Sequence, residues 1–250
     1  MHTTPDILSL LAIGTATFLF AGLVKGTIGL GLPTVAMGLL GLVLPPATAA
    51  TVLLVPSFVT NAWQMLDGPE LGRLLRRLWP MLAGVVAGTL AGSWSIGLAW
   101  PGAGAALGVA LALYGLVGLL GLRVAAEQVK AIWIGPAVGL ATGLVTAATG
   151  VFVLPAVPYL QALGLGKDEL VQALGLSFTV STVALGAGLL QAQVLDAPLL
   201  GLSVLALLPA GAGMWLGQML RARVSEAVFR TVFFAGLLVL GGYAVVRGLA

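Results

Sequence analysis

The chain has 250 residues, of which 60% are hydrophobic and only 8% are charged, with a formal net charge of +3. Soluble domains carry about a quarter charged residues, so this composition excludes an ordinary soluble enzyme. Cysteine is absent and the single histidine, His2, lies in a polar terminal segment, so we predict neither a disulfide framework nor a metal site. The basic residues lie in short loops between apolar segments, where they indicate membrane topology rather than nucleic-acid binding.

Charges, prolines and glycine-rich breaks divide the chain into about ten apolar segments, and a spanning helix needs about 20 apolar residues. The composition therefore predicts an all-α, polytopic transmembrane helical bundle. No basic region precedes the first segment, which favours a membrane span over a cleaved signal peptide. In chain order the predicted segments cover residues 7–24, 28–44, 47–66, 78–98, 101–121, 131–148, 151–165, 169–192, 198–219 and 227–247.

Two of these segments are short and interrupted. Residues 28–44 contain Gly29, Gly31 and Pro33, and residues 151–165 follow Gly150 and contain Pro155 and Pro158. As helices they would reach only about 25 and 22 Å, less than a hydrocarbon core of about 30 Å. We expect them to be broken or re-entrant helices, and the sequence leaves open whether they cross fully.

The loops that follow odd-numbered segments carry ten of the eleven lysines and arginines, and the other side carries only Arg247. Cytoplasmic loops of membrane proteins are enriched in basic residues, so this asymmetry predicts a bacterial inner-membrane protein with both termini on the periplasmic side. The ten are Lys25, Arg73, Arg76, Arg77, Arg123, Lys130, Lys167, Arg221, Arg223 and Arg230.

The chain also contains a weak internal repeat. Gly29 and Gly150 are 121 residues apart, and Ser57-Phe58 recurs as Ser177-Phe178 after 120 residues. Pro80-x3-Gly84-x3-Gly88 recurs as Pro209-x3-Gly213-x3-Gly217, and Tyr114 recurs as Tyr243, both after 129 residues. We predict two transmembrane repeats, residues 1–125 and 126–250, within one membrane domain. Five segments per half would give an inverted repeat, the architecture of many secondary transporters.

Lys25 is the basic residue closest to a broken-helix motif, in the run from Gly22 to Gly31. Glycines let backbone N–H groups approach an anion, and a neighbouring lysine would supply charge. The alternative is that Lys25 extends from the end of the first span to the membrane surface. The glycine spacings Gly84-Gly88-Gly92 and Gly135-Gly139-Gly143 more simply predict close helix packing.

The remaining candidates are neutral. Asn61 and Gln64 share one face of an apolar span, and burying an unpaired amide is costly, which favours a functional role for Asn61. Hydroxyl side chains near both breaks and in the second-half counterpart of that span are further candidates, although such groups often bond to their own backbone. The predicted substrate-binding residues are Lys25, Gly26, Thr27, Gly29, Gly31, Asn61, Gln64, Thr149, Gly150, Ser177 and Ser181.

All eight acidic residues fall in predicted loops or at helix ends. A proton relay of the usual kind and a cation pathway therefore lack a carboxylate within a span. A polar site with one lysine suits a small anion, and we expect no catalytic residue, metal or cofactor. Besides the anion, we expect the lipid bilayer and a second copy of the chain as partners.

At these residues the sequence resembles the TauE/SafE family of sulfite and organosulfonate exporters. The resemblance is carried by Gly22-Leu-Val-Lys25-Gly26-Thr-Ile-Gly29-Leu-Gly31, by the span that reaches Asn61-Ala-Trp-Gln64, and by Gly143 to Pro155 in the second half. It implies transport of sulfite, sulfoacetate or a related organosulfonate. Where the family has consecutive glycines, the second half has Gly150-Val-Phe-Val, which favours a site in the first half.

Other functions remain alternatives at this point. The chain could import rather than export, because the direction of transport depends on the substrate gradient. It could also carry another small oxyanion or carboxylate, because the choice of substrate depends on the detailed geometry of the site. An intramembrane enzyme would need clustered His, Asp, Glu or Cys within spans, which the sequence lacks. A non-transporting membrane subunit is the remaining possibility, and no motif favours it.

Overall fold

The computed structural model describes residues 7–121, 133–221, 223 and 225–249, and these residues form helices and connecting turns without a β-strand. The predicted loop residues Arg123 and Lys130 lie outside the described residues. In chain order the helices are α1 (Ile7–Ile28), α2 (Leu32–Leu40), α3 (Pro46–Leu66), α4 (Leu71–Ser95), α5 (Ala103–Leu120), α6 (Ile134–Thr149), α7 (Ala156–Ala162), α8 (Lys167–Gln191), α9 (Ala197–Leu205), α10 (Leu207–Arg221) and α11 (Glu226–Leu249).

Seven helical stretches of the described chain are long and apolar enough to cross a membrane, with α9 and α10 counted as one, and α6 is a shorter apolar helix. This confirms the predicted all-α polytopic membrane bundle. One boundary was wrong: the segment predicted at residues 198–219 divides into α9 and α10 at Ala206. Pro209 explains the division, because a proline lacks the N–H that would bond to the carbonyl of Leu205.

The two short segments contain the shortest helical pieces of their halves. α2 has nine residues and α7 has seven, which correspond to helices of about 13 and 10 Å. Each follows a break with glycine at positive φ: Gly29 (79°) and Gly31 (105°) before α2, and Gly150 (72°) before α7. A side chain at these angles would be strained, so glycine allows the chain to leave one helix and begin the next.

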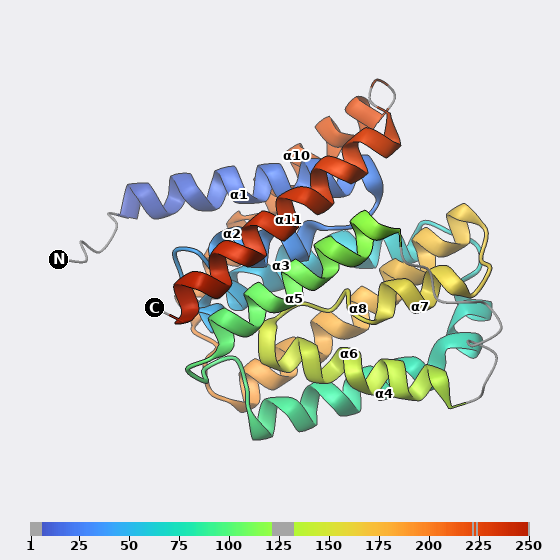
Figure 1. Ribbon diagram of the computed structural model, residues 1–250, viewed down its shortest axis with the longest axis horizontal. Helices are drawn as coiled ribbons and strands as arrows, with labels where there is room; N and C mark the ends of the chain where they lie inside the picture. Colours follow the sequence, from blue (N-terminus) through green and yellow to red (C-terminus); the bar gives the residue numbers. More distant parts are fainter. Residues whose placement is uncertain (1–6, 122–132, 222, 224, 250) are drawn as a thin grey trace.

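Both short segments nevertheless carry the chain from one end of the bundle to the other. Thr27 lies against Gly217, whereas the carbonyl of Leu42 accepts a hydrogen bond from Arg247 at the opposite end. The second short segment is fixed at its two ends in the same way. Trp100 donates to the carbonyl of Ala148 just before this segment, and Arg77 donates to the carbonyl of Leu163 near its end. In Figure 1, α1 begins and α11 ends on the left, and the bond from Arg247 in the last turn of α11 places Leu42 at that end.

Glycines position the outer helix pairs. Gly22 and Gly26 of α1 pack against the backbone of α10, while Gly213 and Gly217 of α10 pack against α1. The same contact occurs between α6 and α4, where Gly139 and Gly143 meet Gly84 and Gly88 in the same reciprocal way. A Cβ at these glycines would overlap a backbone carbonyl of the partner helix. The predicted packing role of the Gly-x3-Gly runs is confirmed.

The remaining counterpart helices pack on each other. α3 lies antiparallel to α8, with Asn61 near Gly175 and Leu54 near Gly186, and α5 lies antiparallel to α11 (Figure 1). α8 lies at the centre of the bundle. Of its most apolar stretch, 72% is buried inside the protein, against 22% for α11. Antiparallel counterparts are what an inverted repeat requires, and the inversion of the two halves stays a prediction.

Candidate functional site

Lys25 is buried in the protein interior, with only 3% of its surface exposed. The close approach of α1 and α10 at Gly22 and Gly26 occupies one side of α1, and the Lys25 side chain reaches α3 instead, where its Nζ donates to Oδ1 of Asn61. Lys25 therefore does not extend to the protein surface, which decides against the second of the two sequence interpretations.

A chain of hydrogen bonds continues from this contact. The Asn61 amide donates from Nδ2 to Oγ of Ser57, one turn earlier on α3, over 3.1 Å. The Ser57 and Thr182 hydroxyls are 2.9 Å apart. Thr182 donates its own proton to the carbonyl of Phe178, so Ser57 is the donor to Thr182. The chain links α1, α3 and α8, and it fixes the Asn61 amide with its oxygen toward Lys25.

Proline and serine shape α3 beside this chain. Pro56 lies inside the helix and cannot bond to the carbonyl of Val52. Ser203 of α9 replaces the missing donor: its hydroxyl donates to that carbonyl over 2.7 Å and accepts from the N–H of Val55. The contact satisfies the interrupted helix about two turns before Asn61.

The charge of Lys25 has no acidic partner in the described chain. Helices α1, α2 and α3 carry no other charged residue, and no carboxylate of the described residues lies within ion-pair distance of Lys25. An ammonium has three donors, and Asn61 accepts from one of them. A buried cation of this kind is costly unless an anion or further acceptors complete its environment.

The other predicted site residues are those near the first break, those with backbone partners elsewhere, and two serines without a partner. Gly29 and Gly31 form the first break, and the N–H of Gly29 bonds to the carbonyl of Lys25. Thr27 bonds to the carbonyls of Leu23 and Gly217. Gly26 packs against Met214, so its role is close helix contact.

Gln64 and Thr149 have backbone partners. Gln64 donates to the carbonyl of Val171 and therefore joins α3 to α8. Thr149 donates to the carbonyl of Val145 and accepts from the N–H of Val151, beside Gly150 at the second break. Gln64 therefore stabilises the packing of α3 on α8, Thr149 stabilises the second break, and neither is hydrogen-bonded to Lys25 in the described structure.

Ser177 and Ser181 differ from all of these. Both are fully buried on α8, and neither hydroxyl has a hydrogen-bond partner in the structure. Thr89 of α4, which the sequence interpretation omitted, is likewise buried and unpartnered. Its signal was weak, because a single threonine in a glycine-rich helix resembles the threonines of α6 that bond to their own backbone.

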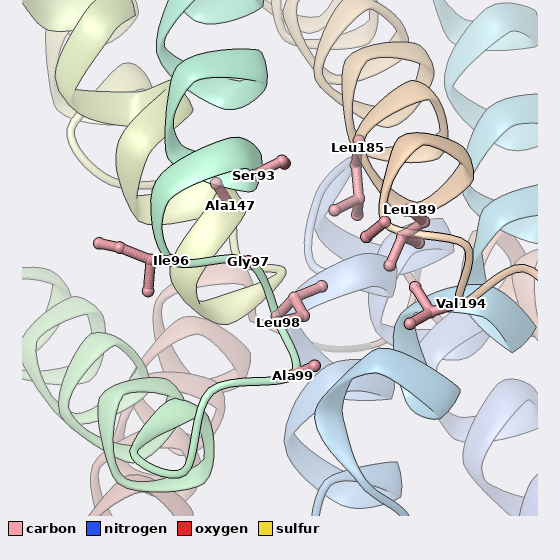
Figure 2. A pocket seen from close by; sticks show the side chains of 11 residues that line it. Ser93, Ile96, Gly97, Leu98, Ala99, Ala147, Leu185, Leu189 and Val194 are labelled. Carbon is pink, nitrogen blue, oxygen red and sulfur yellow. The ribbon is translucent and has the colours of Figure 1, made fainter.

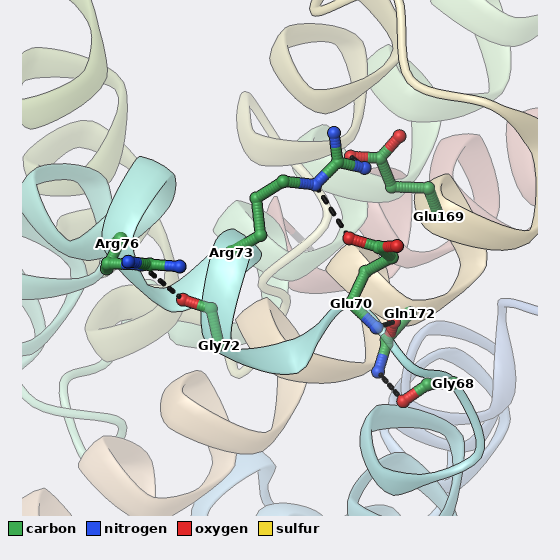
Figure 3. Close-up of polar contacts among 7 residues, drawn as sticks. All are labelled: Gly68, Glu70, Gly72, Arg73, Arg76, Glu169 and Gln172. Atoms are coloured by element: carbon green, nitrogen blue, oxygen red, sulfur yellow. Dashed lines mark hydrogen bonds and ion pairs between the residues drawn. The ribbon is translucent and has the colours of Figure 1, made fainter.

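A polar cluster joins α4 to α8 at the end of the bundle where α1 and α3 finish (Figure 3). Arg73 bonds to Glu70 and to Glu169, both over 2.7 Å. Gln172 is nearly inaccessible; it accepts from the N–H of Glu70 and donates to the carbonyls of Met65 and Gly68. We call this the basic end, because Arg73, Arg76, Arg77, Lys167 and Arg221 lie there.

The comparison with protein families decides the class. The sequence matches the family described as TauE: Sulfite exporter TauE/SafE over residues 14–244. The chain belongs to the TauE/SafE family. TauE/SafE proteins are membrane transporters, and the match spans both halves of this bundle, so the protein is a multi-pass membrane transporter of the sulfite and anion type. Comparisons with curated proteins and with solved structures returned no match.

Proposed function

We propose that this TauE/SafE protein exports a small sulfur-containing anion, such as sulfite or sulfoacetate, and binds it at Lys25. The observation that carries the proposal is a buried ammonium that donates to one neutral amide and faces no carboxylate of the described chain. Two further N–H donors of Lys25 suit the oxygens of a sulfite or sulfonate group, and charge-assisted bonds of this kind are short and strong.

The polar neighbours define what the site selects. Asn61 is oriented by Ser57, so its oxygen holds Lys25 and adds no negative charge. A carboxylate in that position would neutralise the lysine and exclude an anion. At the first break, a Cβ on Gly29 would be in ordinary contact with Val171 at 3.7 Å, whereas a Cβ on Gly31 would crowd Val24 and Phe233. The arrangement supports a compact oxyanion rather than a cation.

The membrane potential supports export. Both termini are proposed to face the periplasm, with the basic end in the cytoplasm of a bacterial cell. An anion that leaves a cell with a negative interior gains about 2.3 kcal/mol per charge for each 100 mV. Lys25 lies in the last turn of α1, near the basic end, which supports entry of the substrate from the proposed cytoplasmic side.

The test is anion flux in proteoliposomes at imposed membrane potentials, with sulfite and sulfoacetate as substrates. We expect flux that follows the potential in the wild type and falls at least about tenfold in Lys25→Met, since one lost charge-assisted hydrogen bond is worth about 1.5–3 kcal/mol. Arg76→Gln is the matched control, because Arg76 is exposed and bonds within its own helix. Folded wild type without flux of either anion would contradict the substrate assignment.

A further inference from the structure

The end of the bundle opposite the basic end contains an open cleft of about 100 Å³. Its walls come from the last turns of α4, α6 and α8 and from the loop after α4 (Figure 2). Ser93 faces it from α4 and Leu185 from α8, with Ala147 of α6 and Leu98 of the loop beside them. The cleft therefore opens between α8 and the end of α4 with its following loop, with α6 contributing Ala147.

The unpartnered hydroxyls lie beneath this cleft. Thr89 is one turn before Ser93 on α4, and Ser181 is one turn before Leu185 on α8, so each continues the helix face that lines the cleft. Ser177 lies a further turn below Ser181 on the same face. All three are fully buried, and they are three of the five buried side-chain atoms without a hydrogen-bond partner among the described residues.

The register of α4 and α8 brings these positions to similar depth. The two helices run parallel, with Glu70 beside Gln172 near their starts and Ser93 against Gly188 near their ends. Thr89 and Ser181 therefore lie between these contacts, on neighbouring helices. Buried polar groups are almost always hydrogen-bonded, so hydroxyls that share a place below an open cleft indicate a position that a polar ligand fills.

We propose that Thr89, Ser181 and Ser177 form a second, uncharged binding site for a sulfonate or sulfite group, between the cleft and Lys25. The inference rests on the proposed function and adds a second binding site for the same substrate along its path through the protein. The three hydroxyl donors match the acceptor oxygens of such a group. Because no cation stands beside them, binding there is weaker than at Lys25, which suits a site from which the anion is released.

The hydrogen-bonded chain from Lys25 ends beside the second site. It begins at Lys25 and ends on α8 at Thr182, the residue next to Ser181. By the repeat offsets of 121 and 120 residues, Ser181 corresponds to Asn61, Ser177 to Ser57 and Thr146 to Lys25. On the predicted repeat, Ser177 and Ser181 therefore occupy the places in the second half that Ser57 and Asn61 occupy in the first, and Thr89 of α4 completes the second site.

The natural absence of cysteine makes thiol labelling a direct test. Ser181→Cys and, separately, Thr89→Cys are reconstituted and treated with a membrane-impermeant methanethiosulfonate that carries a sulfonate group. We expect modification from the cleft side, slowed at least threefold by sulfoacetate. Thr179→Cys is the matched control: it is buried on the same helix, and its hydroxyl already bonds to the carbonyl of Gly175, so we expect no modification.

The same measurement in a Lys25→Met background separates the two proposals. Protection by sulfoacetate that persists without Lys25 supports an independent second site, even if the wild type shows no flux and the transport proposal fails. Flux in the wild type without protection at either cysteine would overturn the second site and leave the proposed function intact. Failure of both cysteines to react, in proteins that elute as folded monodisperse particles, would also overturn it.

Discussion

The predicted repeat pairs Lys25, Asn61 and Ser57 of the first half with Thr146, Ser181 and Ser177 of the second. In the first half these side chains form a continuous set of hydrogen bonds that includes a cation. In the second, Thr146 bonds to the carbonyl of Thr142, and the two serines have no partner.

The helix contacts around these two sets are, in contrast, alike. Reciprocal glycine pairs join α1 to α10 and α6 to α4 in the same way. On the predicted repeat, the two halves have similar helix contacts and differ in the polar groups placed on them. One half offers charge and a fixed acceptor, and the other offers only hydroxyl donors. Substitutions that exchange these groups should therefore change transport, whereas substitutions in the shared scaffold should change stability.

The largest loss of flux is expected when the lysine of the first half is replaced by the residue type found at the equivalent position of the second half. Lys25→Thr removes the buried charge, and we expect sulfoacetate flux to fall at least tenfold with little loss of folded protein. Thr146→Lys in addition should not restore flux, because Ser181 cannot replace the oriented amide of Asn61. Flux assays in proteoliposomes measure both variants. Restored flux in the double variant would show that the halves are interchangeable and would break the comparison.

A carboxylate in the first site should act almost as strongly. Asn61→Asp keeps an acceptor for Lys25 but adds the negative charge that the site lacks, so the lysine becomes paired and binds anions poorly. We expect nearly complete loss of flux and unchanged or higher thermal stability. Asn61→Ser, which copies Ser181, should lose less, about tenfold. If Asn61→Asp transported as well as the wild type, an anion at Lys25 would be contradicted.

How far the sequence predicts this site depends on how rare each residue type is in its span. Lys25 and Asn61 could be identified because a lysine and an amide stand out in apolar helices, and the glycine motif around Lys25 carries the family resemblance. Their contact could not be predicted, since it depends on how α1 and α3 pack. Thr89 could not be distinguished from Thr142 or Thr146, because a hydroxyl bonded to its own helix and an unpartnered one have the same sequence signal.

The fold was more accessible to sequence reasoning than the site. Apolar length predicts the spans, and proline and glycine predict the breaks before α2 and α7, because these residues act locally on the backbone. The division between α9 and α10 was missed for a local reason, since Pro209 lies inside an otherwise uniform apolar segment. The pairing of α1 with α10 and of α6 with α4 follows from the glycine spacing only once the helices are placed in space.

The shared scaffold predicts equal effects in the two halves. Gly22→Ala and Gly143→Ala occupy equivalent positions, and the added Cβ would overlap the carbonyl of Ala210 or of Val85. Overpacking of this kind costs about 1–3 kcal/mol, so we expect similar falls in thermal midpoint in detergent. Gly14→Ala is the control, with nothing within 4 Å of its Cβ, and should be neutral or slightly stabilising. Unequal falls for the equivalent pair would contradict the scaffold symmetry.

The smallest effect is expected at the ion pairs of the basic end, which have no counterpart in the second half because Leu202 lies at the position equivalent to Arg73. The Arg73 side chain is 56% exposed, and exposed pairs contribute about 0–1 kcal/mol. A double-mutant cycle of Arg73→Gln and Glu169→Gln should therefore give a coupling energy below about 1 kcal/mol that shrinks further in high salt, with flux unchanged within twofold. The buried Gln172, which bonds to three backbone groups beside them, is the part of the cluster that holds α8 to the start of α4. A coupling energy of several kcal/mol between Arg73 and Glu169, insensitive to salt, would instead mean that the pair is shielded from water and that charge at the basic end contributes to the difference between the halves.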